Sequence, residues 1–233
     1  MKLEEAKVLV TGGSSGIGRE VARLLVERGA AVAICGRNEA RLREAAAAVG
    51  ATAVPGDVSV EADAVRMVRE VIGAFGDYNV LVNNAGIGAF APLTETTADQ
   101  LRRVWEVNVL GATLVARESA RHFVTRQYGN IINVSSTAGL RAGPGGSAYA
   151  STKFALRGLT ESWRAELRTH HVRVMLLNPS EVVTEFAERA GHAQQANPSK
   201  LHPSDIAHAV AAMLTMEDRG FIPELSVWAT NPK

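Results

Sequence analysis

Short apolar runs alternate with segments of helical periodicity along the whole of this 233-residue chain. The runs predicted to be strands are Lys7–Thr11, Ala31–Cys35, Thr52–Pro55, Val80–Val82, Asn130–Val134, Val172–Leu177 and Phe221–Val227. Between them, apolar residues recur at helical spacing in segments 17–28, 39–49, 61–75, 97–126, 150–169 and 204–215. This alternation predicts an α/β fold, a doubly wound parallel sheet of seven strands with helices on both faces. A hydrophobic content of 46% is enough for one domain spanning residues 1–233.

A glycine-rich turn follows the first predicted strand and leads directly into a predicted helix. Glycines let the backbone turn tightly and approach a ligand, and a helix N-terminus presents N–H groups and the positive end of its dipole to an anion. The spacing G-x-x-x-G-x-G differs from the generic dinucleotide pattern G-x-G-x-x-G, so this turn alone is weak evidence. It predicts a pyrophosphate site whose binding residues are Gly12, Ser14, Ser15, Gly16, Ile17 and Gly18.

Tyr149 and Lys153 stand four residues apart, which places a phenol and an ammonium on one face if this stretch is helical. A free phenol has a pKa near ~10. A neighbouring positive charge favours the phenolate and lowers that pKa towards the neutral range. Ser136, at the end of the run Asn130–Val134, could polarise a carbonyl held over the phenol. Such pairs also occur by chance on surface helices, so the pair gains meaning only from its context.

Together these motifs resemble those of the short-chain dehydrogenase/reductase family, and the resemblance covers nearly the whole chain. Thr11–Gly18 is similar to the family's T-G-x-x-x-G-x-G motif, and Asn83–Gly86 to its N-N-A-G motif. Pro179–Thr184 matches the family's P-G-x-V-x-T segment, except that Ser180 replaces the glycine. Four residues fall where the family places its catalytic tetrad: Asn108, Ser136, Tyr149 and Lys153. The resemblance implies a Rossmann-like fold.

The resemblance also implies a reaction, the transfer of a hydride between nicotinamide C4 and a carbonyl or alcohol carbon without a metal. Tyr149 would be the acid or base, and Lys153 would lower its pKa and bind the nicotinamide ribose. Ser136 would hold the substrate oxygen, with Ser135 as the only rival for that role. Asn108 would interrupt the helix and hold a water that links Lys153 to solvent.

The residues that select between NAD and NADP are expected at the end of the second predicted strand. Enzymes that bind NAD place a carboxylate there for the ribose hydroxyls, whereas Gly36 holds that position here. Arg37 and Asn38 follow, and an arginine is a good partner for a phosphate, so this end favours NADP. Ser14 and Ser15 could add hydroxyl contacts. Alternatively, Arg37 could simply open the next helix.

Further cofactor contacts are implied by the resemblance. Asp57 and Val58 match the family's contact with the adenine edge, although Asp57 could be an ordinary turn residue. The remaining implied contacts are Asn84, Ala85, Gly86, Pro179, Val182 and Thr184, together with Tyr149 and Lys153. Serine at position 180 would be strained if that position needs a positive φ. Glu181 would disfavour acidic substrates, or is simply a solvated glutamate. The polar stretch 191–199 is predicted to be a loop.

Two rival functions remain for the same motifs. Reductases of 3-oxoacyl groups on acyl carrier protein dock their acidic partner on basic residues, and Gln127, beside Arg126, takes the first of those places. His170, near Arg168, takes the second, and residues 221–232 lack the T-G-x-x-L-x-V-D-G-G ending of that branch. A small-carbonyl reductase is therefore favoured over the carrier-dependent enzyme. The other rival is an NADP-binding sensor without turnover, against which the intact tetrad argues.

Charge and hydropathy limit the partners and the location. A net charge of +1 gives no electrostatic case for nucleic acid or an anionic membrane. No apolar run reaches the roughly eighteen residues of a membrane span. The first predicted strand begins close to Met1, which leaves no room for a signal peptide, so a cytoplasmic protein is expected. The single cysteine, Cys35, reads as a buried small apolar residue.

The family commonly assembles through two long helices, which correspond here to segments 111–126 and 150–169. A homodimer or homotetramer is therefore expected. These segments contain more large apolar side chains than a solvated face should carry, although some of them must face the protein's own sheet. The candidates are Leu114, Val115, Phe123, Phe154, Leu159 and Trp163.

Overall fold

The structure, a computed structural model, describes residues 1–191 and 199–231. Seven strands form one parallel sheet in the order β3-β2-β1-β4-β5-β6-β7. The strands are β1 (Lys7–Thr11), β2 (Ala31–Gly36), β3 (Thr52–Pro55), β4 (Val80–Asn83), β5 (Gly129–Val134), β6 (Val172–Pro179) and β7 (Glu224–Val227). The predicted seven-stranded parallel sheet is confirmed. β7 is shorter than predicted because it begins after Pro223, whose ring nitrogen has no proton to donate to a ladder.

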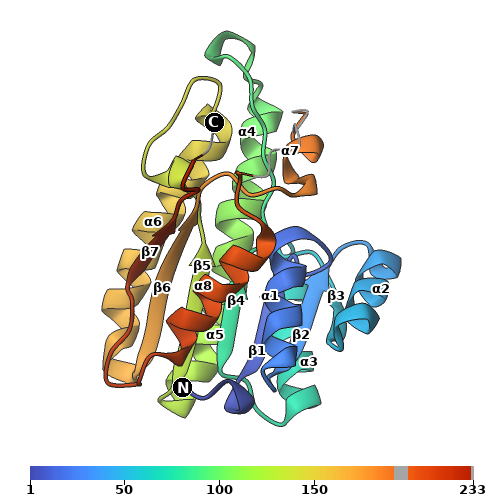
Figure 1. Cartoon of the computed structure of the whole chain (residues 1–233), viewed down its shortest axis with the longest axis vertical. Helices are drawn as coiled ribbons and strands as arrows, with labels where there is room; N and C mark the ends of the chain where they lie inside the picture. The colour runs from blue at the N-terminus through green and yellow to red at the C-terminus, as the bar shows by residue number, and fades with distance from the viewer. Residues whose placement is uncertain (192–198, 232–233) are drawn as a thin grey trace.

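Helices lie on both faces of the sheet. They are α1 (Gly16–Glu27), α2 (Glu39–Val49), α3 (Glu61–Phe75), α4 (Ala98–Trp105), α5 (Ala112–Arg126), α6 (Ser147–Leu167), α7 (Glu185–Arg189) and α8 (Pro203–Thr215). Figure 1 shows α1 and α8 in front of the sheet, and these two helices share one core with the strand residues that face them. Helices α3 and α5 belong to the core on the opposite face.

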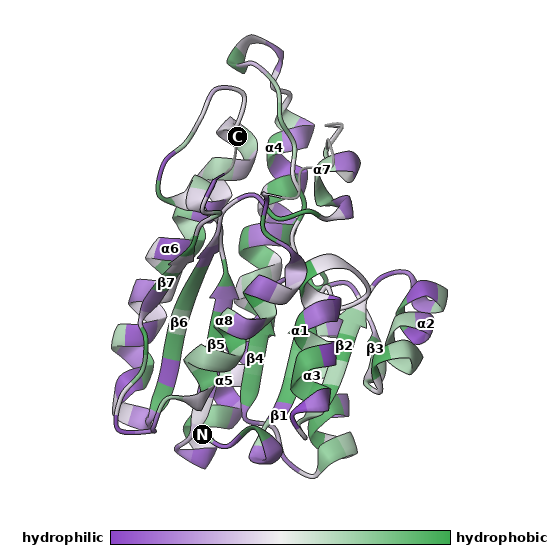
Figure 2. Cartoon of the chain, viewed as in Figure 1, coloured by the Kyte–Doolittle hydropathy of each residue, from purple (hydrophilic) through white to green (hydrophobic). Residues whose placement is uncertain are grey.

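Both faces of the central strands are buried, which explains why their sequences are mostly apolar. In β1, Val8 and Val10 point into the core of α1 and α8, whereas Leu9 points into the core of α3 and α5. Figure 2 shows this pattern as predominantly green strands between helices of mixed colour. Cys35 is fully buried, and burial raises the pKa of its thiol to about 12, as expected for an apolar residue of the core.

The segment predicted as one helix, 97–126, consists of α4, a π-helical turn (Glu106–Gly111) and α5. A π turn adds a residue to the helical repeat, and such turns are frequent at functional sites. Asn108 lies in this turn, and its buried side chain bonds to backbone outside the helix. The predicted loop at 191–199 lies mostly outside the described residues.

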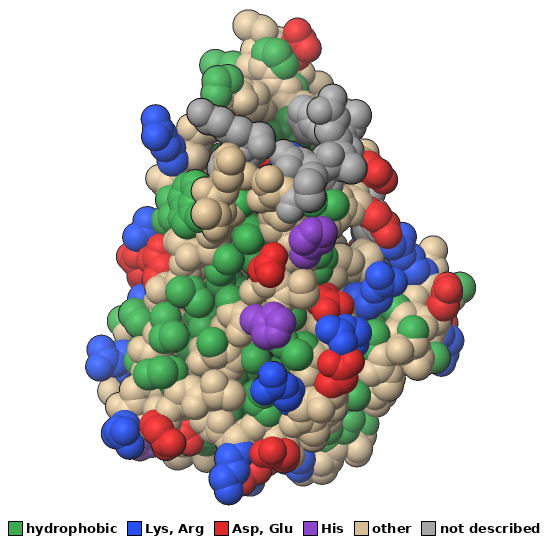
Figure 3. All heavy atoms as spheres, in the orientation of Figure 1, with side chains coloured by type: hydrophobic (Ala, Val, Ile, Leu, Met, Phe, Trp, Pro, Cys, Tyr) green, Lys and Arg blue, Asp and Glu red, His purple; other side chains and the backbone are tan. Residues whose placement is uncertain are grey.

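The strands run in the same direction, so their carboxyl ends share one edge of the sheet. This edge lies in the upper half of Figure 1, with α4 and α7 above it. On the face shown in Figure 3, cationic and anionic side chains are interspersed, in keeping with the small net charge. None of the described helices combines the length and the apolar character needed to cross a membrane.

Candidate active site

The glycine-rich turn joins β1 to α1 in a conformation that other residues adopt only with strain. Gly12 and Gly16 have φ angles of 65° and 52°, in the left-handed region. A Cβ on Gly18 would lie 2.5 Å from the carbonyl oxygen of Gly12, so glycine alone lets the helix approach the turn this closely. The first turn of α1 contains no acidic residue that would compete with an anion. The turn and the helix N-terminus therefore fit a bound pyrophosphate.

The segment after β4 is tied to the glycine-rich turn by hydrogen bonds. The Thr11 hydroxyl accepts from the backbone N–H groups of Asn84 and Ala85, both at 2.9 Å. The Asn84 side chain donates to the carbonyl oxygen of Thr11 at 2.9 Å. Asn84 thus positions the turn through its backbone. Gly86, two residues on, lies beside Asn108 and Lys153, in keeping with its predicted place in the cofactor site.

Ser14 and Arg37 lie together at the ends of β1 and β2. A Cβ added to Gly36 would be 3.5 Å from the Ser14 hydroxyl oxygen, so the space that a carboxylate would fill opens towards Ser14. The Arg37 guanidinium is more than half exposed, 3.7 Å from the Asp57 carboxylate. This open and cationic corner can accept a phosphate group.

Asn38 and Asp57, which were predicted to bind the cofactor, lie next to this corner and form hydrogen bonds within the protein. The Asn38 side chain accepts from the Arg41 backbone N–H at 3.0 Å and caps α2. The Asp57 carboxylate accepts from the backbone and hydroxyl of Ser59, at 3.0 and 2.7 Å. Val58 is buried against the π turn at Gly111. These contacts fix the walls around the Arg37 corner.

Tyr149, Lys153 and Ser136 meet at the carboxyl end of β5. Tyr149 and Lys153 lie on α6, with the ammonium 5.6 Å from the centre of the phenol ring. The Ser136 hydroxyl faces the phenol of Tyr149 and lowers its pKa. The rival serine, Ser135, is buried and donates to the backbone carbonyl of Lys153 at 3.2 Å. Ser136 is therefore the serine that faces the phenol.

The protonation of this pair differs from the expectation. Burial raises the pKa of Tyr149 to about 12, and the nearby Ser136 hydroxyl offsets only part of that rise. Burial lowers the pKa of Lys153 to about 8. The Lys153 ammonium donates to the carbonyl oxygen of Val134 at 3.0 Å. In this state of the protein desolvation dominates, so the pKa of Tyr149 lies above and not below its usual value, and a lowering by Lys153 stays a prediction.

Asn108 connects the π turn to the segment after β4 and to α6. Its side-chain oxygen accepts from the N–H of Ile87 at 2.8 Å, and its amide donates to the carbonyl of Ile87 at 2.9 Å. The amide also donates to the Thr152 hydroxyl at 3.0 Å, and Thr152 donates to the carbonyl of Tyr149 at 2.6 Å. The sequence analysis missed Thr152, although a buried threonine within the Tyr-Lys helix was a signal for such a bond.

The segment after β6 closes against the glycine-rich turn. Pro179 ends β6, and the backbone N–H of Ser180 donates to Val227 at 2.9 Å. Ser180 does not adopt a positive φ, so the predicted strain from its replacement of glycine is wrong. Val182 pairs with Leu201. The Thr184 methyl group would lie 3.3 Å from a Cβ on Gly16, which places this segment over the start of α1.

Glu181 forms an ion pair with Lys200 at 2.7 Å. Its charge is thereby compensated by a neighbour within the same segment. The Glu181 side chain is also largely exposed, in line with the alternative of a solvated glutamate, and its effect on acidic substrates stays a prediction.

The chain belongs to the short-chain dehydrogenase/reductase family, because the family model for short chain dehydrogenases matches residues 6–195. It is similar to the diacetyl reductase [(S)-acetoin forming] of Staphylococcus aureus, 39% identical over 186 residues that cover 77% of this chain and 72% of the relative. The protein is thus an oxidoreductase of this family with a Rossmann-like fold.

Two solved structures extend the comparison over the whole chain. The alcohol dehydrogenase of the archaeon Thermococcus sibiricus, complexed with 5-hydroxy-NADP, is 29% identical and superposes with a TM-score of 0.88, covering 97% of this chain and 98% of its own. The 3-ketoacyl-(acyl-carrier-protein) reductase of Brucella melitensis, complexed with NADH, is 30% identical with a TM-score of 0.90, covering 97% of both chains. Both neighbours hold a nicotinamide cofactor.

Proposed function

We propose that this protein is an NADP-dependent reductase of small carbonyl compounds, with Tyr149 as the proton donor. The observation that carries the proposal is the meeting of Ser136, Tyr149 and Lys153 beside the glycine-rich turn, although these segments lie far apart in the sequence. NADPH consumption over a panel of diketones, β-ketoesters, aldehydes and acyl thioesters tests it. Cofactor binding without consumption on any carbonyl would support the non-catalytic alternative.

The bound nicotinamide would supply the hydride to the carbonyl carbon. Tyr149 would give its phenolic proton to the carbonyl oxygen, while Ser136 orients that oxygen by a hydrogen bond. A pKa of about 12 keeps Tyr149 protonated at neutral pH, so the phenol would be able to donate a proton during reduction. Lys153, whose pKa is about 8, can exchange protons in this range and resupply the phenol. Both amide protons of Asn108 are donated to protein atoms, so the expected water would bind a backbone carbonyl of the π turn.

We expect NADPH to bind about 10- to 100-fold more tightly than NADH, because Arg37 can form at least one charge-assisted bond with the additional phosphate. Arg37→Ala should remove most of this preference and leave the dissociation constant for NADH nearly unchanged. Quenching of tryptophan fluorescence measures both constants without turnover. Arg43→Ala is the matched control, since Arg43 is an exposed arginine on α2 that pairs with Glu39. Equal affinities for the two cofactors in the unmodified protein would refute the assignment.

The residues at the two expected docking positions give less support to a reductase that acts on acyl carrier protein. Arg126 pairs with Asp77 at 3.2 Å, so its charge is partly compensated. Gln127 and His170 are hydrogen-bonded to each other at 3.0 Å. These contacts favour a free small molecule over an acidic carrier protein as the substrate.

We further propose that the protein is a homodimer or homotetramer. Leu114, Val115 and Phe123 are buried in the protein's own core, so they are not the outward residues that the sequence suggested. Phe154 is 45% exposed on α6, and Trp105 is 41% exposed on α4, which packs beside α6. A groove of 630 Å³ runs between α5 and α6, and Trp163 lines it. Large apolar side chains and a groove on one face favour contact with a second copy.

Light scattering should give a mass of at least twice the 24.7 kDa of one chain. Phe154→Glu should shift this mass towards the monomer, because it would bury a charge in the contact. Leu93→Glu is the control, since Leu93 is 80% exposed and lies off the α5–α6 face. A monomeric unmodified protein would contradict the proposal.

A further inference from the structure

Two phenylalanine rings flank the phenol of Tyr149. The centre of the Phe90 ring lies 5.4 Å from that of Tyr149, with the planes tilted by 48°. The Phe186 ring lies at the same distance of 5.4 Å, with a tilt of 54°. A Cβ on Gly88 would be 2.9 Å from an atom of each phenylalanine ring, so both rings also pack against the backbone at this point. The sequence analysis assigned no role to either phenylalanine.

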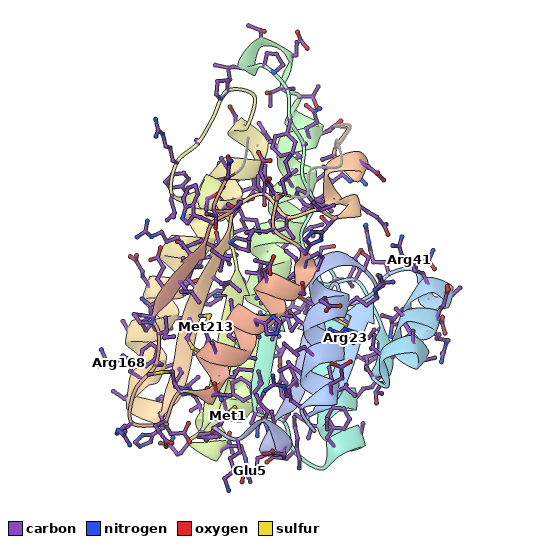
Figure 4. All side chains as sticks on the ribbon, viewed as in Figure 1. Met1, Glu5, Arg23, Arg41, Arg168 and Met213 are labelled. Carbon is purple, nitrogen blue, oxygen red and sulfur yellow. The ribbon has the colours of Figure 1, made fainter. Side chains whose placement is uncertain are left out.

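Separate elements above the carboxyl edge of the sheet bring these rings together. Phe90 belongs to the segment that follows β4, and Phe186 belongs to α7. The Thr184 hydroxyl accepts from the backbone N–H of Phe186 at 3.3 Å and caps the helix. Glu185, the residue before Phe186, is held by Arg41 of α2, which is labelled in Figure 4. The Arg41 guanidinium donates to both carboxylate oxygens of Glu185, at 2.7 and 2.6 Å. Phe186 therefore directly follows two anchored residues, Thr184 and Glu185.

Two carboxylates of the segment after β6 have ion-pair partners. Glu181 pairs with Lys200, and Glu185 pairs with Arg41. A charged substrate group would have to compete with one of these pairs and would lose hydration next to aromatic surface. The surroundings of Tyr149 thus suit a neutral and apolar substrate.

We infer that Phe90 and Phe186 form an aromatic clamp that binds the aryl group of a neutral ketone or aldehyde, with its carbonyl at Tyr149. This inference rests on the proposed function and adds the substrate class to it. Aromatic pairs prefer tilted or offset geometries with centres about 4.5–7 Å apart, so a substrate ring would pack beside these two rings in the same way. Burial of a phenyl group also contributes an apolar area that a methyl group lacks.

The test compares two α-diketones that differ only in one substituent. 1-Phenyl-1,2-propanedione carries a phenyl group where 2,3-butanedione carries a methyl group. With NADPH, the kcat/KM for the phenyl compound should exceed that for butanedione by about 10- to 100-fold. Phe186→Ala and, separately, Phe90→Ala should lower this ratio by about tenfold or more. Leu93→Ala, a change in the exposed part of the Phe90 segment, should leave the ratio as in the unmodified protein.

A binding measurement keeps the inference testable without turnover. Saturation-transfer NMR with NADP⁺ and 1-phenyl-1,2-propanedione should show contact with the phenyl protons, and this signal should weaken in Phe186→Ala. A ratio near one, or a ratio unchanged in both phenylalanine variants, would overturn the clamp while reduction of either diketone still supports the proposed function. Binding of the phenyl compound through the clamp without any reduction would instead overturn the proposed function and leave the clamp supported.

Discussion

Tyr149→Phe is expected to lower turnover by about 10²–10⁴-fold, the usual loss when a general acid is removed. The substitution keeps the ring, so the contacts with Phe90 and Phe186 remain, and only the phenolic hydroxyl that faces Ser136 is lost. Cofactor affinity should be largely retained. Steady-state kinetics with the best carbonyl of the panel and fluorescence titration with NADPH measure the two effects separately.

The matched control for this change is Tyr128→Phe. Tyr128 bonds to Asp218 through its hydroxyl at 3.4 Å, away from the site, so its loss should leave turnover within a few fold of normal. Retention of most of the activity by Tyr149→Phe would mean that another group donates the proton, and the proposed mechanism would have to be abandoned.

Lys153→Met should abolish most of the turnover and at the same time stabilise the fold at neutral pH. Lys153 is only 5% exposed, and burial lowers its pKa from 10.5 to about 8, so its positive charge is held at a cost. One pKa unit corresponds to about 1.4 kcal/mol. Methionine keeps the apolar stem but loses the bond to Val134, which is worth about 1 kcal/mol. We expect a net rise of about 1–2 kcal/mol in the free energy of unfolding.

The pH dependence of the free energy of unfolding shows whether the gain comes from removing the buried charge of Lys153 or from better packing. Below a pH of about 8, lysine is charged in both the folded and the unfolded chain, so the unmodified protein bears the full penalty. Between 8 and 10.5 the unfolded chain binds more protons than the folded chain, and the stability of the unmodified protein therefore rises with pH. The advantage of Lys153→Met should shrink over this window in urea unfolding experiments. An advantage that is absent near neutral pH, or that does not shrink, would contradict the account.

The sequence predicted the sheet well because its signal is local. Parallel strands covered on both faces have continuous apolar runs, as in Val8–Val10 of β1 and Val174–Leu177 of β6, and this pattern is visible without any tertiary contact. The π turn at Glu106–Gly111 could not be predicted by periodicity, because it depends on bonds between Asn108 and the distant Ile87. The burial of Phe123 and Val115 was likewise decided by which side of α5 meets the sheet.

The candidate site was predicted from motifs, and the structure places its tetrad residues around one edge of the sheet. The motifs did not predict the environment of these residues. The raised pKa of Tyr149 follows from burial, and the rings of Phe90 and Phe186 come from segments without a motif. The pairing of Glu181 with Lys200 also needed the folded chain, because 19 positions separate the two residues in the sequence.

The central claim is that hydride passes from NADPH to a carbonyl carbon while Tyr149 supplies the proton. The most direct measurement uses NADPH that carries deuterium in place of both hydrogens at nicotinamide C4, with a diketone as substrate and mass spectrometry of the hydroxyketone product. The account predicts one deuterium on the carbinol carbon and a loss of this product in Tyr149→Phe. A product without deuterium, or no product from a protein that binds NADPH, would contradict it.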